Sequence, residues 1–208
     1  MNGPSNTHPA KSKRRSVLKR CLDLILVLVS APFWLPIIAV LALLVRLKLG
    51  SPVLFRQPRP GRNAAVFELL KFRNMTNARD ANGQLLQDVQ RLTPFGRWLR
   101  CTSLDELPEL INVLKGEMSL VGPRPHMLEH TEKYSQLINR YMVRHLVKPG
   151  ITGLAQVNGY RCETKELSVM EARVKCDTWY LENWTFWLDI NIMVKTVWNM
   201  IKGESKAY

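Results

Sequence analysis

Cysteine is scarce in this chain, and acidic residues are far outnumbered by basic ones. The four cysteines show no C-x-x-C spacing, so the sequence predicts neither a zinc site nor a redox motif. No segment repeats another at a fixed period, which argues against a repeat architecture. No small-residue cleavage pattern follows the apolar segment near the N-terminus, so we expect no cleaved signal peptide. The length of 208 residues suits one compact domain and an anchor.

The charge balance is strongly positive. The chain has 30 Lys and Arg residues against 17 Asp and Glu residues, a net charge of +13. Such a balance indicates an anionic partner, which could be a nucleic acid, a membrane surface or a phosphorylated substrate. Residues 1–18 are predicted to be a basic, disordered N-terminus, and the positive-inside tendency places this end on the cytoplasmic side. Six basic residues precede the apolar segment with no acid among them: Lys11, Lys13, Arg14, Arg15, Lys19 and Arg20.

The longest uncharged stretch is Leu24 to Val45, and its 22 residues are enough to cross a bilayer. A simple transmembrane helix is therefore the first hypothesis. Pro32 and Pro36 lie in the middle, however, and each removes a helical hydrogen bond and favours a bend. Basic residues also flank both sides. We therefore predict that residues 19–49 form a broken, re-entrant membrane helix, with freed carbonyls satisfied by groups such as Ser30.

A small β-hairpin is predicted after the apolar segment. Residues 53–56 and 66–70 alternate as strands do, and residues 58–63 between them contain turn formers. Lys71 and Arg73 follow at a spacing that would point both cations the same way in an extended segment. Such a pair suits a pyrophosphate group, although an ordinary solvated pair is the alternative.

Two adjacent carboxylates, Asp105 and Glu106, stand in the string T-S-L-D-E-L-P-E-L-I-N-V-L-K-G-E-M-S-L-V-G-P-R-P at residues 102–125. Proline is tolerated in the first turn of a helix, so Pro108 predicts a helix that starts near Leu104 or Asp105. Both acids would then lie at its positive end. An ionised aspartate beside phosphate and a metal ion is a potential nucleophile, and the glutamate could orient the metal or carry a proton.

A second interpretation of the same residues is structural. Ser103 and Glu106 also match the S-x-x-E capping box, in which the serine caps the helix and the glutamate reaches back to its backbone. From these residues alone both interpretations stay open.

Cations and turns surround the two acids in sequence. Arg100 precedes them, and the stiff turn Gly122 to Pro125 displays Arg124. Further on, the glycines of the segment Lys148 to Gly153 permit close approach of a ligand or form a structural turn, and Gln156 could bind a base or sugar. The aromatic and apolar residues from Trp179 to Ile201 predict an amphipathic helix at a membrane interface or in the core.

The 102–125 string resembles the signature of the bacterial sugar transferases, the monotopic polyprenyl-phosphate phosphoglycosyl transferases. Three further pieces agree: P-V-L-F-R-Q at 52–57, K-F-R-N-M at 71–75 and K-P-G-I-T-G-L-A-Q-V-N-G at 148–159. The resemblance covers residues 19–202. It implies a mainly α fold with a small β-hairpin, in which a re-entrant membrane helix precedes a catalytic domain (residues 50–208) with interfacial amphipathic helices.

The resemblance also implies a reaction. Members of this family move a sugar-1-phosphate from a UDP-sugar to undecaprenyl phosphate and release UMP, with Mg²⁺ as cofactor and the aspartate matching Asp105 as nucleophile. Glu106 would orient the metal or act as acid and base. The phosphate-binding and substrate-binding residues would be Lys71, Arg73, Arg100, Arg124 and Gln156. Family spacing to Gly50 favours a membrane kink at Pro36, whereas Ser30 stands two residues before Pro32, so both prolines stay candidates.

The sequence thus predicts a hexose-1-phosphate transferase on the cytoplasmic face of the bacterial inner membrane, acting early in exopolysaccharide, capsule or O-antigen assembly. Its partners would be a UDP-sugar, undecaprenyl phosphate and membrane lipids, without nucleic acid. One rival is a direct, ternary-complex transferase. A second is a non-enzymatic membrane adaptor or nucleic-acid binder, which leaves the 102–125 string unexplained. The sugar, the pathway and a homo-oligomeric state stay open.

Overall fold

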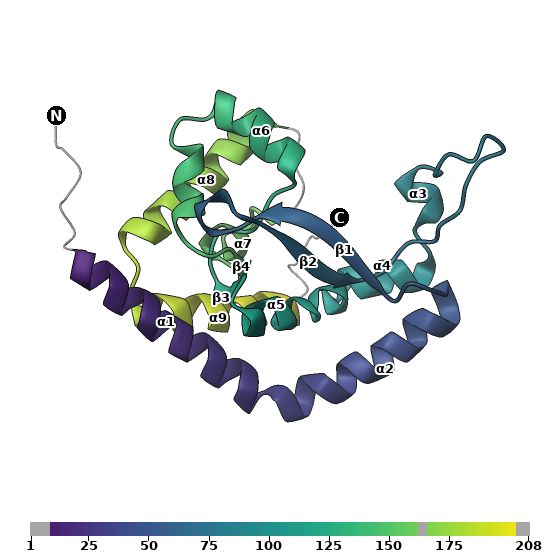
Figure 1. Cartoon of the computed structure of the whole chain (residues 1–208), viewed down its shortest axis with the longest axis horizontal. Coiled ribbons are helices and arrows are strands. Elements are labelled where there is room, and N and C mark those ends of the chain that lie inside the picture. Colours follow the sequence, from purple (N-terminus) through teal and green to yellow (C-terminus); the bar gives the residue numbers. More distant parts are fainter. Residues whose placement is uncertain (1–8, 162–165, 203–208) are drawn as a thin grey trace.

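The computed structural model describes residues 9–161 and 166–202. Two long helices, α1 (Pro9–Val29) and α2 (Ala31–Leu49), form a V below the rest of the chain, and their arms meet at Ser30 (Figure 1). Helix α2 is the one described helix that is long and apolar enough to cross a membrane by length and composition. Both free ends of the V lie on the side of the remaining domain.

The break between the arms lies at Ser30, beside Pro32 and not at Pro36. Pro32 occupies the first turn of α2, where a missing N–H costs nothing, and Pro36 lies inside α2, which continues through it. Of the two candidate prolines, the break therefore lies beside Pro32, and Pro36, which the family spacing favoured, does not interrupt α2. As expected, Ser30 hydrogen-bonds carbonyls at the break, because its hydroxyl donates to Val27 O at 3.2 Å and to Leu26 O at 2.6 Å. The indole of Trp34 adds a hydrogen bond to Val27 O at 3.0 Å.

The N-terminal boundary also differs from the expectation. Helix α1 begins at Pro9, so the second half of the segment 1–18 is helical and not disordered, while residues 1–8 lie outside the described residues. Proline is favoured at a first helical position, and the Lys, Arg and Ala residues that follow it are good helix formers. These propensities extend the helix ahead of the apolar run.

The predicted hairpin is confirmed and is longer than expected. Strands β1 (Leu54–Pro60) and β2 (Val66–Phe72) pair antiparallel, with Leu54 opposite Phe72, and the 3₁₀ turn η1 (Arg62–Ala64) lies between them. A second sheet of two parallel strands, β3 (Ser119–Val121) and β4 (Gly150–Thr152), was not predicted. Three residues are too few to show the alternation by which a strand is recognised in sequence.

The rest of the described chain is mainly helical, which confirms the predicted fold class at this level. The remaining elements are α3 (Asp88–Arg91), α4 (Pro94–Cys101), η2 (Leu104–Glu106), α5 (Glu109–Lys115), α6 (Leu128–Leu137), η3 (Tyr141–Leu146), α7 (Leu154–Val157), α8 (Leu167–Glu182) and α9 (Phe186–Ile201).

The V is packed into the core of the domain. Val27 and Trp34 join one apolar cluster with residues of β2 and α5, and Leu41 and Val45 join another with Phe72. Polar contacts hold α1 as well, since Lys19 pairs with Asp189 of α9 at 2.5 Å. The arms are therefore fixed relative to the residues between β2 and α5.

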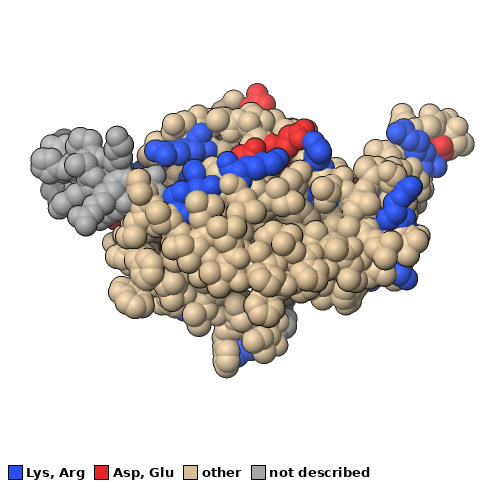
Figure 2. All heavy atoms as spheres, turned by 60° about the horizontal axis from the view of Figure 1, so that its bottom comes forward, with Lys and Arg blue, Asp and Glu red and all other residues tan. Residues whose placement is uncertain are grey.

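The outer side of the V is apolar and exposed. Figure 2 shows this side as a broad surface with few charges, bordered by Lys and Arg side chains. We call this surface the apolar face. Exposed large apolar residues of the helices α1, α2 and α9 include Val17, Ile25, Leu28, Val29, Phe33, Leu35, Val40, Leu43, Leu47, Trp187, Val194, Val197, Trp198 and Ile201. An uncovered surface of this size marks an interaction site rather than an ordinary solvated surface.

Candidate active site

Glu106 is the centre of a buried group of charges. Lys71 of β2 donates to its Oε1 at 2.9 Å, and Arg124 pairs with the same oxygen. Arg161 donates to its Oε2 at 3.1 Å. The side chain of Glu106 is only 10% exposed, so three cations surround one carboxylate in a place with little water. Although burial alone would raise the pKa of Glu106, Arg124 and Lys71 hold it well below its usual range.

Asp105 lies beside this group in a different environment. Its Oδ2 accepts a hydrogen bond from Asn74 Nδ2 at 2.9 Å, and Asn74 Oδ1 accepts one from Arg100 at 3.3 Å. Its other oxygen has no hydrogen-bond partner among the described residues. Burial and the charge of Glu106 raise the pKa of Asp105, against the opposing effects of Lys71 and Arg100. Asp105 is therefore the carboxylate with an open oxygen.

The backbone around the two acids excludes the capping box. Ser103 has a left-handed conformation (φ 57°) and its side chain caps no helix; its hydroxyl accepts from Arg161 at 2.7 Å instead. The two acids lie in the 3₁₀ turn η2, which starts at Leu104 as expected, but α5 begins only at Glu109, after Pro108. The side chain of Glu106 is thus directed to cations and not to its own backbone.

Glu109 is a third buried carboxylate that the sequence did not single out. It is 1% exposed, and its Oε1 lies 3.3 Å from Lys71 Nζ, so one ammonium bridges Glu106 and Glu109. Burial is the main reason that the pKa of Glu109 is raised to about 7, with the charge of Glu106 adding to the effect. Asn74 and Arg161 were also missed, because neither lies close to the two acids in sequence.

We expect Glu109→Gln to change how stability depends on pH. The pKa of Glu109 is raised from 4.5 to about 7 on folding, so the folded state binds more protons between these values and wild-type stability falls as pH rises. The variant lacks this fall, so the free energy of unfolding of the variant relative to the wild type should rise by up to about 3 kcal/mol across the window. Urea unfolding at several pH values checks this, and parallel profiles would contradict it.

Two predicted site residues lie elsewhere. Arg73 donates to Ser51 O at 2.8 Å and to Leu49 O, so it caps the end of α2 and does not point with Lys71. The strand ends at Phe72, so the alternation that would align the two cations stops before Arg73. Gln156 of α7 donates to Ile151 O at 3.1 Å, and no hydrogen bond joins it to Asp105 or Glu106. Of the predicted cations, the structure brings Lys71, Arg100 and Arg124 to the acids.

Gly150 and Gly153 allow close packing of the backbone against Gly122. A Cβ at Gly150 would lie 2.1 Å from Gly122 N, and one at Gly153 would lie 2.2 Å from Gly122 O. The structure therefore supports the turn interpretation: these glycines let β4 approach the turn that carries Arg124.

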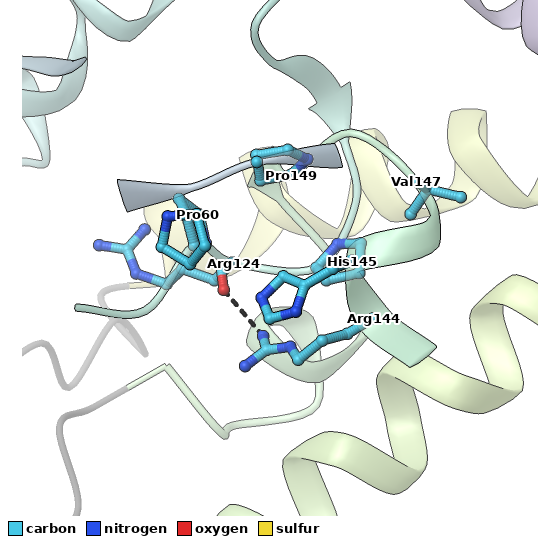
Figure 3. Close-up of a pocket in the computed structure, with 9 residues that line it drawn as sticks. Pro60, Arg124, Arg144, His145, Val147 and Pro149 are labelled. Carbon is cyan, nitrogen blue, oxygen red and sulfur yellow. Dashed lines mark hydrogen bonds between the residues drawn. The ribbon is translucent and has the colours of Figure 1, made fainter. Parts of the chain in front are cut away.

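A buried ion pair, Arg144 with Asp177, holds the backbone of Arg124 in place. Arg144 of η3 donates to the carbonyl of Arg124 at 2.8 Å and pairs with Asp177 of α8 at 2.8 Å. Figure 3 shows the guanidinium of Arg144 directed at this carbonyl, in a small pocket that Pro60, Val147 and Pro149 also line. The backbone of the Gly122 to Pro125 turn is thus fixed while the Arg124 side chain reaches Glu106.

Comparison with known proteins agrees with this arrangement. The family model described as bacterial sugar transferase matches residues 14–203. The chain is 45% identical to a UDP-glucose:undecaprenyl-phosphate glucose-1-phosphate transferase of Xanthomonas campestris pv. campestris, over 92% of this chain and 40% of that protein. It is 47% identical to a protein of the same name from Escherichia coli (strain K12), over 87% of this chain and 39% of that one.

A third relative is similar in length to this chain. It is the protein named uncharacterized sugar transferase EpsL of Bacillus subtilis (strain 168), 46% identical over 90% of this chain and 89% of its own length. By contrast, the chain spans about two fifths of the two glucose-1-phosphate transferases. The family match and these relatives cover the V, the acids and the cations around them, and the chain therefore belongs to the bacterial sugar transferase family.

Proposed function

We propose that the protein transfers a sugar-1-phosphate, a hexose-1-phosphate, from a UDP-sugar to undecaprenyl phosphate and releases UMP. The observation that carries the proposal is the pairing of one buried carboxylate with an open oxygen, Asp105, and a second that is held ionised by three cations, Glu106. The two relatives named as glucose-1-phosphate transferases have undecaprenyl phosphate in their names, which supports the same class of reaction.

The proposed chemistry has two displacements. An oxygen of Asp105 attacks the phosphorus that carries the sugar, the bond from this phosphorus to the bridging oxygen breaks, and UMP leaves with the electron pair. A phosphate oxygen of undecaprenyl phosphate then attacks the same phosphorus and releases Asp105, giving a lipid diphosphate sugar. Splitting one difficult displacement into two is the general advantage of covalent catalysis.

The cations have distinct proposed roles. Lys71, Arg124 and Arg161 lie together on Glu106, where a diphosphate could exchange contacts with them and have its charge neutralised as it shifts to the leaving group. Arg100 acts through Asn74, whose amide orients Asp105. Arg73 and Gln156 keep no direct role in the proposal, because their hydrogen bonds lie away from the acids.

Magnesium is the proposed cofactor. No group of three or more His, Cys, Asp or Glu side chains in the described part of the chain could hold a metal ion by itself. Proteins usually hold Mg²⁺ by one or two carboxylates together with substrate phosphates, and Asp105 and Glu106 supply such a pair. When bound, the ion would neutralise negative charge on the donor diphosphate. The three cations already on Glu106 favour Asp105 as the principal protein ligand.

The apolar face explains how a soluble donor and a lipid acceptor could meet. We propose that α1 and α2 enter one leaflet from the cytoplasmic side of the inner membrane and return to it, with the acids held at the interface. Cys21 and a cysteine at the exposed position Lys48, with the other cysteines replaced by serine, report the topology. Both should react with a membrane-impermeant maleimide only after the membrane is opened. Reaction of one of them in intact cells would contradict the proposal.

The reaction itself is tested by UMP release. Purified protein is given undecaprenyl phosphate, Mg²⁺ and each UDP-sugar of a panel that includes UDP-glucose, the donor named for two relatives. Release with one hexose donor, dependent on the acceptor for continued turnover, is the expected result, and it also identifies the sugar. No release with any donor would contradict the proposed function. We propose that the product, a membrane-bound sugar, enters exopolysaccharide, capsule or O-antigen assembly.

A further inference from the structure

A second group of cations lies at the far end of α5 from the acids. Lys148 Nζ and Arg20 Nη2 each lie 3.5 Å from the point that a Cβ at Gly116 would occupy, so the two charges converge on one spot. Lys115, the residue before Gly116, is exposed, as is Arg62 of η1. Helix α5 begins at Glu109 and ends at Lys115, so about 10 Å separates this group from the active-site end.

No acid forms an ion pair with the cations of this group in the described part of the chain. Arg20 donates to Val113 O at 2.5 Å and to Leu114 O at 2.9 Å, contacts with neutral carbonyls. In the described part of the chain, Lys148 and Arg62 make no side-chain hydrogen bond or ion pair. Burial, and then the charges of Arg20 and Arg62, lower the pKa of Lys148, while Asp23 opposes them.

The two acids near this group are already engaged. Asp23 Oδ1 accepts from Leu120 N at 3.0 Å and from Ser119 at 3.1 Å. Glu117 accepts from the buried Asn112 at 2.7 Å. Arg20, Arg62 and Lys148 therefore share a small area in which cations outnumber the carboxylates, and these carboxylates accept hydrogen bonds from other groups. Like charges are gathered in this way where an anion binds between them.

The location decides which anion fits. Arg20 is part of α1, and exposed apolar residues of α1 flank it, with Leu18 two residues before it and Ile25 less than two helical turns after it. The group thus lies beside the apolar face, where Figure 2 shows Lys and Arg side chains along the border. A ligand with a phosphate on an apolar tail would contact both surfaces at once.

We propose that Arg20, Arg62, Lys115 and Lys148 bind the phosphate of an anionic phospholipid headgroup, at a site separate from the one that holds the acceptor. The proposal rests on the proposed membrane location of the V. The test of the lipid site measures bound lipid and not turnover. The lipid-binding proposal can therefore fail while the proposed reaction holds, and the reverse is also possible.

The test compares retained lipids in two charge-matched double variants. Purified full-length protein in detergent is titrated with short-chain phosphatidylglycerol or phosphatidylcholine, and bound lipid is counted by native mass spectrometry. The variant R62Q/K148Q removes two cations of the group and leaves Arg20 to cap α5. The control K133Q/K175Q removes two exposed cations, Lys133 of α6, which lies on the opposite side of the domain from the V (Figure 1), and Lys175 of α8.

Wild type and control should retain phosphatidylglycerol in preference to phosphatidylcholine, and R62Q/K148Q should bind phosphatidylglycerol about 10-fold more weakly or worse. Equal retention by R62Q/K148Q and wild type would overturn the proposal. An equal loss in the control would also overturn it, because overall charge would then explain the binding. Competition by millimolar inorganic phosphate without any preference for the lipid would assign the group to free phosphate and overturn the lipid assignment.

Discussion

Asp105→Asn is expected to abolish sugar-phosphate transfer and leave the fold and the membrane association intact. The amide has nearly the shape of the carboxylate and can still accept from Asn74, but it has no charged oxygen to attack phosphorus. We expect UMP release to fall by at least about 10⁴-fold, as is typical when a covalent nucleophile is removed. Initial rates with saturating UDP-sugar and undecaprenyl phosphate measure this effect.

The stability of Asp105→Asn is a second readout, and unlike the activity it should not decrease. Burial raises the pKa of Asp105, which means that the charged form is disfavoured in the folded state. A neutral amide should therefore leave the melting temperature unchanged or raise it. Asp88→Asn, at a carboxylate that is 75% exposed, is the matched control and should keep full activity. Substantial turnover by Asp105→Asn would exclude Asp105 as nucleophile.

Glu106→Gln, one residue away, is expected to cost both activity and stability. Glu106 is the shared partner of Lys71, Arg124 and Arg161, and its loss removes the one carboxylate that all three cations contact, although Lys71 keeps its ion pair with Glu109. Removing one partner from a buried ion pair typically costs about 3 to 5 kcal/mol. We expect a loss of that size in urea unfolding, together with a fall in transfer activity because the phosphate-binding cations lose their common anchor.

The matched control is Glu68→Gln. Glu68 also pairs with an arginine, Arg56 at 3.1 Å, but both side chains are more than 60% exposed. Such surface pairs contribute about 1 kcal/mol or less. If Glu106→Gln had the same free energy of unfolding as Glu68→Gln, the contacts of Lys71, Arg124 and Arg161 with Glu106 would not be stabilising ion pairs. That result would contradict the proposed arrangement of the site.

Elements with a local signal could be predicted from sequence. The hairpin followed from alternation and a turn, and the two prolines in the apolar run indicated a broken helix because each removes a helical hydrogen bond and favours a bend. The sequence left the position of the break open between the two prolines, and in the structure Pro32 takes the first turn of α2, where a proline is compatible with a helix. Which of the two prolines lies in the first turn of α2 depends on how α1 and α2 pack, and the local sequence does not report this packing.

The site was predictable where one string held its residues, as for Asp105, Glu106 and Arg124. Arg161 and Asn74 come from segments far away in sequence, so only the fold brings them to the acids. The misplacement of Arg73 has a local cause, since its strand ends one residue earlier. The raised pKa of Glu109 depends on burial beneath Lys71, which no pattern in the sequence reports.

The most direct test of the central claim is a search for the covalent intermediate. Purified protein is incubated with Mg²⁺ and a UDP-sugar labelled in the phosphate next to the sugar, without undecaprenyl phosphate, and then denatured. The account predicts that label stays on the polypeptide of the wild type, is absent from Asp105→Asn, and leaves when the acceptor is added before denaturation. UMP release that needs the acceptor from the first turnover, with no label on the protein, would contradict it and favour direct transfer.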